Sequence, residues 1–163
     1  KNFNYDNVEN KKEIEDFIER RGLKNYYPFN FLLAEIAFEN DNFDKAQKIY
    51  EYFVRYPKHI TGRELAESYY KLGVIFKNKK SYYTALKLLE KNLSESFNGI
   101  RDKSRVEYVK ILMLKDKCDE IIIYVPIFVK DMKNEHLKKE INEIFNFCVA
   151  EKNKVENSKE VNK

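Results

Sequence analysis

Two segments of the chain, residues 31–50 and 70–89, align with each other without gaps. This internal repeat limits the possible folds more than any other feature of the sequence. The matched pairs are, in order, Leu33-Ala34 with Leu72-Gly73, Phe43 with Tyr82, Ala46 with Ala85 and Tyr50 with Leu89. Self-similarity of this kind is typical of stacked supersecondary units, in which each unit covers an apolar face of its neighbour.

The repeated positions have a physical explanation as a pair of packed helices. A small residue, Ala34 or Gly73, allows two helices to approach closely, and we expect the second small residue, Ala46 or Ala85, to pack against it from the following helix. Short polar segments, residues 39–42 and 77–81, separate the two halves of each unit. They are too short for any connection except that of an antiparallel helical hairpin.

The composition agrees with an all-α fold. The 163 residues include only 4 Gly and 3 Pro, fewer turn residues than an all-β sandwich needs. The chain is 43% hydrophobic and 36% charged, which is too apolar for a disordered protein. A chain of this length buries enough surface to fold as one domain without a disulfide or a metal. We predict about seven to eight helices.

The second unit resembles the tetratricopeptide repeat (TPR). Counting from Ala66, the matching residues are Tyr69, Leu72, Gly73, Phe76, Tyr82, Ala85 and Leu89. The first unit matches less well, with Ala37 where a large residue is usual, although Pro57 closes its second helix as a proline commonly does in this family. The resemblance implies a short TPR-like solenoid of stacked antiparallel hairpins, with repeats at about 27–58 and 66–97.

The repeats are irregular, and the flanking segments match the motif poorly or not at all. Ala34 and Gly73 lie 39 positions apart, against about 34 in the family, so we expect extra residues around 58–62. We predict a helix from about Asn10 to Arg21, ended by Gly22, and a kink or break at Pro126. The predicted divisions are a polar leader (1–9), a TPR-like domain (10–152) containing a degenerate unit (about 103–130) and a capping helix (about 135–152), and a disordered tail or linker (153–163).

Charge and hydropathy favour neither nucleic acid nor membrane as a partner. Lys and Arg number 31 against 27 Asp and Glu, a formal charge of +4, and no run of five like charges occurs. The longest apolar run, residues 121–129, is too short for a transmembrane helix and contains a proline. We therefore expect a solvated helical surface and no direct insertion of this segment into a membrane.

Candidate chemical groups are few. Cys118 and Cys148 match no zinc or redox motif, and we interpret them as buried unpaired thiols, with a disulfide as the alternative. His59 and His136 have no motif partner, so we expect both on the surface or in loops. No phosphate-binding loop or nucleophile motif is found. The sequence therefore predicts no enzyme, no cofactor and no metal site.

The resemblance to the TPR family also implies a binding surface. In that family the first helix of each repeat lines a concave groove, and the groove positions here are Pro28, Phe31, Glu35, Phe38 and Glu39, then Glu67, Tyr70, Val74, Lys77 and Asn78. We select Phe31, Glu35, Phe38, Tyr70, Val74 and Lys77 as the candidate partner-binding residues. The alternative is that Phe31 and Tyr70 only pack against neighbouring helices.

This groove is apolar and aromatic, which suits a helix, a strand or a folded surface of a partner protein. Family members that bind a C-terminal carboxylate have Lys and Asn where this chain has Phe31 with Glu35 and Tyr70 with Val74, so we expect no carboxylate clamp.

The predicted function is a non-enzymatic interaction scaffold. Because the sequence begins at Lys1 rather than Met, we expect a processed form or a piece of a longer protein. The first hypothesis is a module of a larger bacterial envelope protein, in the periplasm or associated with the cell envelope. The alternative is a cytoplasmic regulator or chaperone-type adaptor.

Overall fold

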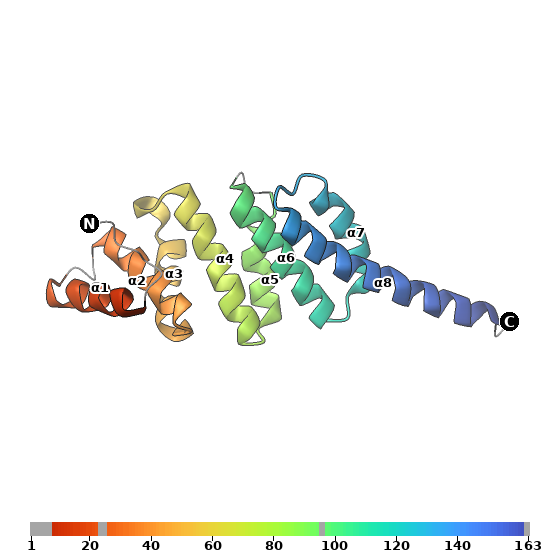
Figure 1. Ribbon diagram of the computed structural model, residues 1–163, viewed down its shortest axis with the longest axis horizontal. Coiled ribbons are helices and arrows are strands. Elements are labelled where there is room, and N and C mark those ends of the chain that lie inside the picture. Colours follow the sequence, from red (N-terminus) through yellow and green to blue (C-terminus); the bar gives the residue numbers. More distant parts are fainter. Residues whose placement is uncertain (1–7, 23–25, 95–96, 162–163) are drawn as a thin grey trace. The chain divides into compact units, whose positions relative to one another are not determined.

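The computed structural model describes residues 8–22, 26–94 and 97–161, and in this part of the chain all regular structure is helical (Figure 1). Eight α-helices and one short 3₁₀ helix follow one another, with no strand between them in these ranges. The prediction of an all-α fold is confirmed. The chain divides into two compact units, Lys1–Lys71 and Leu72–Lys163, and the division falls within helix α4.

The first unit contains three complete α-helices, a short 3₁₀ helix and the start of a fourth α-helix. They are α1 (Val8–Arg20), α2 (Tyr27–Glu39), α3 (Phe43–Arg55), the 3₁₀ helix η2 (Pro57–His59) and α4 (Gly62–Asn78). After α1, Gly22 has a φ of 68°, the left-handed conformation predicted for it. The side chain of Asn42 caps α3 by accepting a hydrogen bond from the Lys45 backbone N–H at 3.3 Å.

Helices α2 and α3 form the predicted antiparallel hairpin, and α1 packs against α2 (Figure 1). The fully buried residues of this unit include the two small residues of the repeat, Ala34 and Ala46. Around them lie the larger buried side chains Ile18, Leu33, Ile36, Tyr50 and Phe53. Small residues on both helices allow close approach, and the aromatic rings fill the remaining space.

The extra residues between the repeats are accommodated in two ways. The 3₁₀ helix η2 takes up three of them, and α4 is 17 residues long where α2 has 13. The start of α4 has a capping box, since Thr61 N–H donates to Glu64 at 2.9 Å and Glu64 N–H donates to the Thr61 hydroxyl at 3.3 Å. The extra residues expected around 58–62 therefore lie in η2 and at the start of α4.

The second unit begins in α4 and continues through α5 (Tyr82–Glu90), α6 (Asn98–Leu114), α7 (Cys118–Val129) and α8 (Glu135–Val161). Helix α6 packs against α5, α7 and α8, and α7 packs along α8. A Cβ atom at Gly73 would lie 2.6 Å from Leu89 Cγ, so this position of α4 needs a glycine to approach α5. The expected contact partner was Ala85, which is also fully buried.

The structure differs from the sequence prediction at three places. Helix α7 continues through Pro126 to Val129, so the predicted break is absent, although the proline supplies no backbone donor to the Ile122 carbonyl one turn earlier. Helix α8 continues to Val161, so residues 153–161 of the predicted tail or linker are helical. An ion pair between Lys154 and Glu151, at 2.6 Å, supports the helix there. Residues 8–9 of the predicted leader lie in α1, while residues 1–7 fall outside the described ranges.

Among the described helices, none combines the length and the apolar character that crossing a bilayer requires.

Candidate interaction surface

The predicted groove residues of the first repeat already have partners inside the first unit. The ring of Phe31 packs against Tyr50 and Phe53 of α3, with ring centroids 6.0 and 5.6 Å apart. Phe38 lies under the Lys71 ammonium group, 4.1 Å from it, and against the ring of Phe43. These contacts are those of a hairpin core and its edge, and they favour the alternative that Phe31 packs against a neighbouring helix.

Glu35 has two polar partners. Its carboxylate accepts a hydrogen bond from the buried Tyr50 hydroxyl and lies 3.5 Å from the Lys71 ammonium group. Burial and the nearby Glu35 carboxylate both raise the pKa of Tyr50, so the phenol stays protonated and remains a donor. The polar group of Glu35 is therefore occupied by contacts within the unit.

The predicted groove residues of the second repeat lie on α4, on both sides of the division between the units. Tyr70 is half-buried in the first unit, and Val74 is half-buried in the second. Lys77, also in the second unit, forms an ion pair with Glu107 of α6. The structure thus brings Phe31, Glu35 and Phe38 together around α3 and Lys71, and places Val74 and Lys77 in the other unit.

The remaining groove positions are Pro28, Glu39, Glu67 and Asn78. Pro28, Glu39 and Asn78 are exposed, and Glu67 lies 3.9 Å from Lys71.

A different surface of the first unit presents large side chains to solvent. Tyr26, Tyr52 and Tyr56 are 61%, 48% and 50% exposed, and we call them the tyrosine patch. The rings of Tyr52 and Tyr56 lie 5.1 Å apart and are tilted by 49°. Tyr26 precedes α2 at the end of the hairpin where α3 finishes, since the ring of its neighbour Tyr27 contacts Phe53 at 5.8 Å.

The helical spacing of α3 explains why these tyrosines are exposed. Ala46, Tyr50 and Phe53 are spaced by four and three residues, so they form one row facing α2, and all three are buried. Tyr52 and Tyr56 lie off this row. The sequence analysis assigned no role to Tyr52 and Tyr56, although their offset from the row of Ala46, Tyr50 and Phe53 is visible in the sequence.

Basic residues lie close to Tyr52 and Tyr56 along the chain. Arg55, Lys58, His59 and Arg63 are all exposed, and the sequence has no Asp or Glu between Glu51 and Glu64. Within the described ranges, the cations Arg55, Lys58 and Arg63 have no ion-pair partner. Three exposed acidic residues of the hairpin, Glu39, Asp41 and Asp44, lie at its other end, around the α2–α3 turn.

Next to Arg63, the side chain of Glu64 is held in place by hydrogen bonds. Its carboxylate accepts from the hydroxyls of Tyr27 and Thr61 and from the Thr61 N–H. Burial opposes ionisation of Glu64, but these donors outweigh it, and the pKa of Glu64 falls below its ordinary value of 4.5. Burial and the Glu64 carboxylate raise the pKa of Tyr27 to about 12. Glu64 is therefore committed to capping α4.

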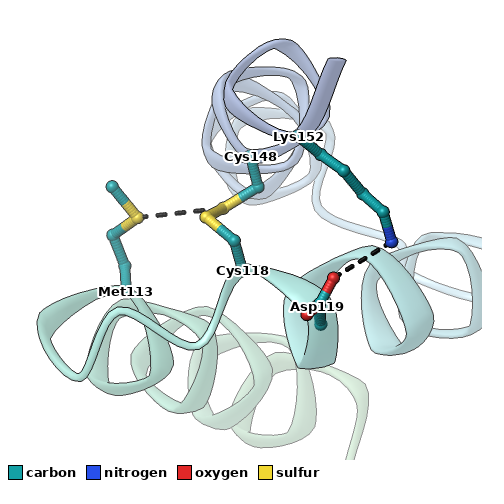
Figure 2. The surroundings of a disulfide bond; sticks show 5 residues. All are labelled: Met113, Cys118, Asp119, Cys148 and Lys152. Atoms are coloured by element: carbon teal, nitrogen blue, oxygen red, sulfur yellow. Dashed lines mark hydrogen bonds and ion pairs between the residues drawn. A yellow bond between two sulfur atoms is a disulfide. The ribbon is translucent and has the colours of Figure 1, made fainter. Parts of the chain in front are cut away.

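In the second unit, a disulfide bond joins Cys118, at the start of α7, to the fully buried Cys148 of α8 (Figure 2). Their Cα atoms lie 5.1 Å apart, and the Met113 sulfur lies 3.9 Å from Cys148 Sγ. An exposed ion pair between Lys152 and Asp119 lies next to the bond. The interpretation of both cysteines as unpaired thiols is wrong in this structure, and the alternative pairing is present.

Buried charges of α6 hold the ends of the helices around it. The Arg105 guanidinium donates to the Leu93 and Phe128 carbonyls, each at 2.9 Å, and to Asp131. The fully buried Asp102 pairs with Arg101 at 3.4 Å and accepts hydrogen bonds from the backbone N–H groups that precede α8, at 2.9 and 3.1 Å. These contacts satisfy helix termini that would otherwise lack partners, which is a structural role.

The histidines and acids form no metal site in the ranges described. His59 and His136 are both exposed, as expected. Among the described residues, no three His, Cys, Asp or Glu side chains lie together in an arrangement that could hold a metal ion.

No protein-family model matches the sequence, and no curated protein or solved structure shows significant similarity to it.

Proposed function

We propose that the chain is a non-enzymatic protein-interaction module with a TPR-like arrangement of helical hairpins. The observation that supports this most strongly is the tyrosine patch, three large side chains about half exposed or more at one end of the α2–α3 hairpin. Tyrosine and arginine are enriched at protein interfaces and at the residues that contribute most to binding. The patch combines both, with Arg55 between Tyr52 and Tyr56.

Three features support the TPR-like part of the proposal. The first repeat is an antiparallel hairpin, the small residues Ala34, Ala46 and Ala85 are fully buried, and Gly73 allows α4 to contact Leu89 of α5. Unlike in the family's usual groove, however, Phe31, Glu35 and Phe38 already have partners within the unit. We therefore place the principal binding surface at the tyrosine patch.

The disulfide favours the cell-envelope hypothesis over a cytoplasmic regulator. Stable disulfides form in oxidising compartments such as the periplasm and are rare in the cytosol. Cys148 is fully buried, so the bond is protected from reductants. We propose that the protein is one module of a larger envelope protein facing an oxidising compartment.

The compartment is tested by quenching cells with acid, denaturing the proteins and then labelling free thiols with a maleimide polymer. We expect no mass shift unless a reductant is added first. If both cysteines react without a reductant, the protein resides in a reducing compartment, and the cytoplasmic alternative replaces the proposal.

The interaction role is tested by placing a photo-crosslinking amino acid at position 52 and, as a control, at position 83. Tyr83 is 74% exposed on α5 and outside the patch. We expect illumination in the native host to link position 52, but not position 83, to a discrete protein. The Tyr56→Ser substitution should weaken that crosslink. Crosslinks that are equally strong at both positions, or missing at position 52, would count against the patch as a binding surface.

A further inference from the structure

We propose that the tyrosine patch binds an acidic peptide segment of its partner, with the tyrosine rings contacting its apolar side chains and Lys48, Arg55, Lys58 and Arg63 binding its carboxylates. This inference rests on the proposed interaction function and specifies the chemistry of the partner.

The tyrosine rings provide a preformed contact surface. Tyr52 lies in α3, and Tyr56 ends that helix directly before Pro57, whose ring fixes the backbone there. The ring of Tyr52 also contacts the buried ring of Phe53 at 5.8 Å, which restrains it from the core side. Rigid aromatic side chains lose little conformational entropy when they bind, so they are efficient contacts for an apolar side chain of a peptide.

The cations lie where a peptide on the tyrosines would reach them. Lys48, Tyr52 and Arg55 are spaced by four and three residues, so they form one row along α3. All three are exposed, and within the described ranges neither cation of the row has an acidic partner. Glu51, which borders the row, accepts a hydrogen bond from Gln47 at 2.7 Å. A guanidinium such as that of Arg55 binds carboxylates in a bidentate geometry.

A contribution to helix stability does not explain the positions of all of these basic residues. Arg55 in the last turn of α3 is favoured by the helix dipole, but Arg63 lies in the first turn of α4, where the dipole disfavours a cation. Lys58 lies in η2 between the two helices. At least one of these basic residues, Arg63, therefore occupies a position that opposes helix stability. This is expected when a residue is retained for binding rather than for folding.

A peptide fits this surface better than a nucleic acid does. The basic residues occupy one end of a hairpin and are bordered by Glu51 and Glu64, whereas a phosphate backbone needs a continuous basic track. The row from Lys48 to Arg55 extends about 10 Å along α3 at a rise of 1.5 Å per residue, a length that a short extended segment can cover.

The test uses the whole chain and three labelled peptides of equal length and equal Leu, Pro and Phe content, which differ only in having Glu, Gln or Lys at the polar positions. Fluorescence anisotropy measures their affinities. We expect the Glu peptide to bind about tenfold more tightly than the Gln peptide, with affinity falling as salt rises. We expect the Lys peptide to bind more weakly still.

Two double variants separate the rings from the charges. We expect Tyr52→Ser with Tyr56→Ser, and Arg55→Glu with Lys58→Glu, each to weaken the Glu peptide about tenfold. The matched control is Tyr83→Ser with Lys115→Glu, which changes one exposed tyrosine and one exposed lysine of the other unit and should leave affinity unchanged. Circular dichroism of each variant establishes that the helices remain.

Equal affinity for the Glu and Gln peptides would overturn the inference, as would unchanged binding in both patch variants. Tighter binding of a single-stranded oligonucleotide through the same residues would replace it with a nucleic-acid site. If sedimentation shows that the chain self-associates and that Arg55→Glu abolishes this, the occupant of the patch is a second copy of the chain instead. Its Glu39, Asp41 and Asp44 would then supply the carboxylates. If position 52 crosslinks to a partner, but that partner binds the Arg55→Glu variant equally well, the proposed interaction function stands. Only the inference that the bound segment is acidic is then overturned.

Discussion

The two units of this chain use different polar contacts to hold their helices together. In the first unit, neutral phenols donate to carboxylates, as Tyr50 does to Glu35, within an aromatic core. In the second unit, the buried charges Arg101, Asp102 and Arg105 connect helix ends, and a disulfide joins α7 to α8. Loss of the Tyr50 hydroxyl would leave the Glu35 carboxylate still beside Lys71, whereas loss of Asp102 would leave buried backbone donors without their acceptor. We therefore expect substitutions to be more damaging in the second unit.

The largest effect should come from Asp102→Ala. It would leave the backbone N–H groups of Lys133 and Asn134 without their acceptor and Arg101 with Asp131 as its remaining partner, at a cost of about 3–5 kcal/mol in the free energy of unfolding. Urea denaturation measures this. The control is Asp119→Ala in the same unit, whose ion pair with Lys152 is exposed, and whose loss should cost less than about 1 kcal/mol. Similar costs for the two variants would contradict the importance of the buried network.

Removal of the disulfide by Cys118→Ala with Cys148→Ala should be the next largest effect. The bond closes a loop with a sequence separation of 30, for which loop entropy gives about 3–4 kcal/mol of stabilisation. Amide hydrogen exchange should quicken in α6, α7 and α8 while α2 and α3 keep their protection. Uniform loss of protection over both units would mean that they unfold as one, and would weaken the comparison.

In the first unit, Tyr50→Phe should cost about 1–3 kcal/mol, because it removes a buried hydrogen bond to a carboxylate but leaves the ring in place. Thermal and urea denaturation measure the change. Tyr52→Phe is the matched control on the same helix, and since that phenol is in the exposed patch its loss should change stability by less than about 0.5 kcal/mol. Equal effects would show that the Tyr50 hydroxyl is not the source of the stability.

The smallest effect should appear at acid pH. Hydrogen bonding by Arg105 lowers the pKa of Asp131 below its ordinary value of 3.8, and Glu64 is depressed below 4.5. A depressed carboxyl pKa stabilises the fold above the unfolded-state pKa, and this stability is lost as pH falls through the folded-state pKa. Glu64→Gln should therefore flatten the acid side of the stability profile of the first unit, and Asp131→Asn that of the second. Hydrogen exchange of α2–α4 reports on the first unit and that of α6–α8 on the second, so measurements between about pH 2 and pH 6 separate the effects of the two variants.

Short-range signals predicted much of the fold. Gly22, Pro57 and the polar turn at residues 39–42 placed helix ends correctly, and the small residues of the repeat are buried as expected. Each of these depends on a local requirement, such as a left-handed φ or a missing backbone donor. Such requirements are visible in the sequence itself.

Features that depend on contacts between distant segments were not predictable. The sequence offers no distance between Cys118 and Cys148, and Asp102 resembles the many solvated acids of a charged helix until the chain before α8 is placed against it. The contacts of the predicted binding residues also depend on distances that the sequence does not supply. Phe31 and Glu35 occupy the expected helix positions, but only the packing of α3 reveals that Tyr50 and Phe53 contact them.

The presence of only two cysteines in these 163 residues has a consequence for the production of the protein. Two thiols allow a single pairing within the chain, so an oxidant is sufficient and no isomerase is needed to correct an intramolecular error. The competing product is a link between two molecules. Its share depends on protein concentration, so dilute oxidation after purification should favour the native bond between α7 and α8.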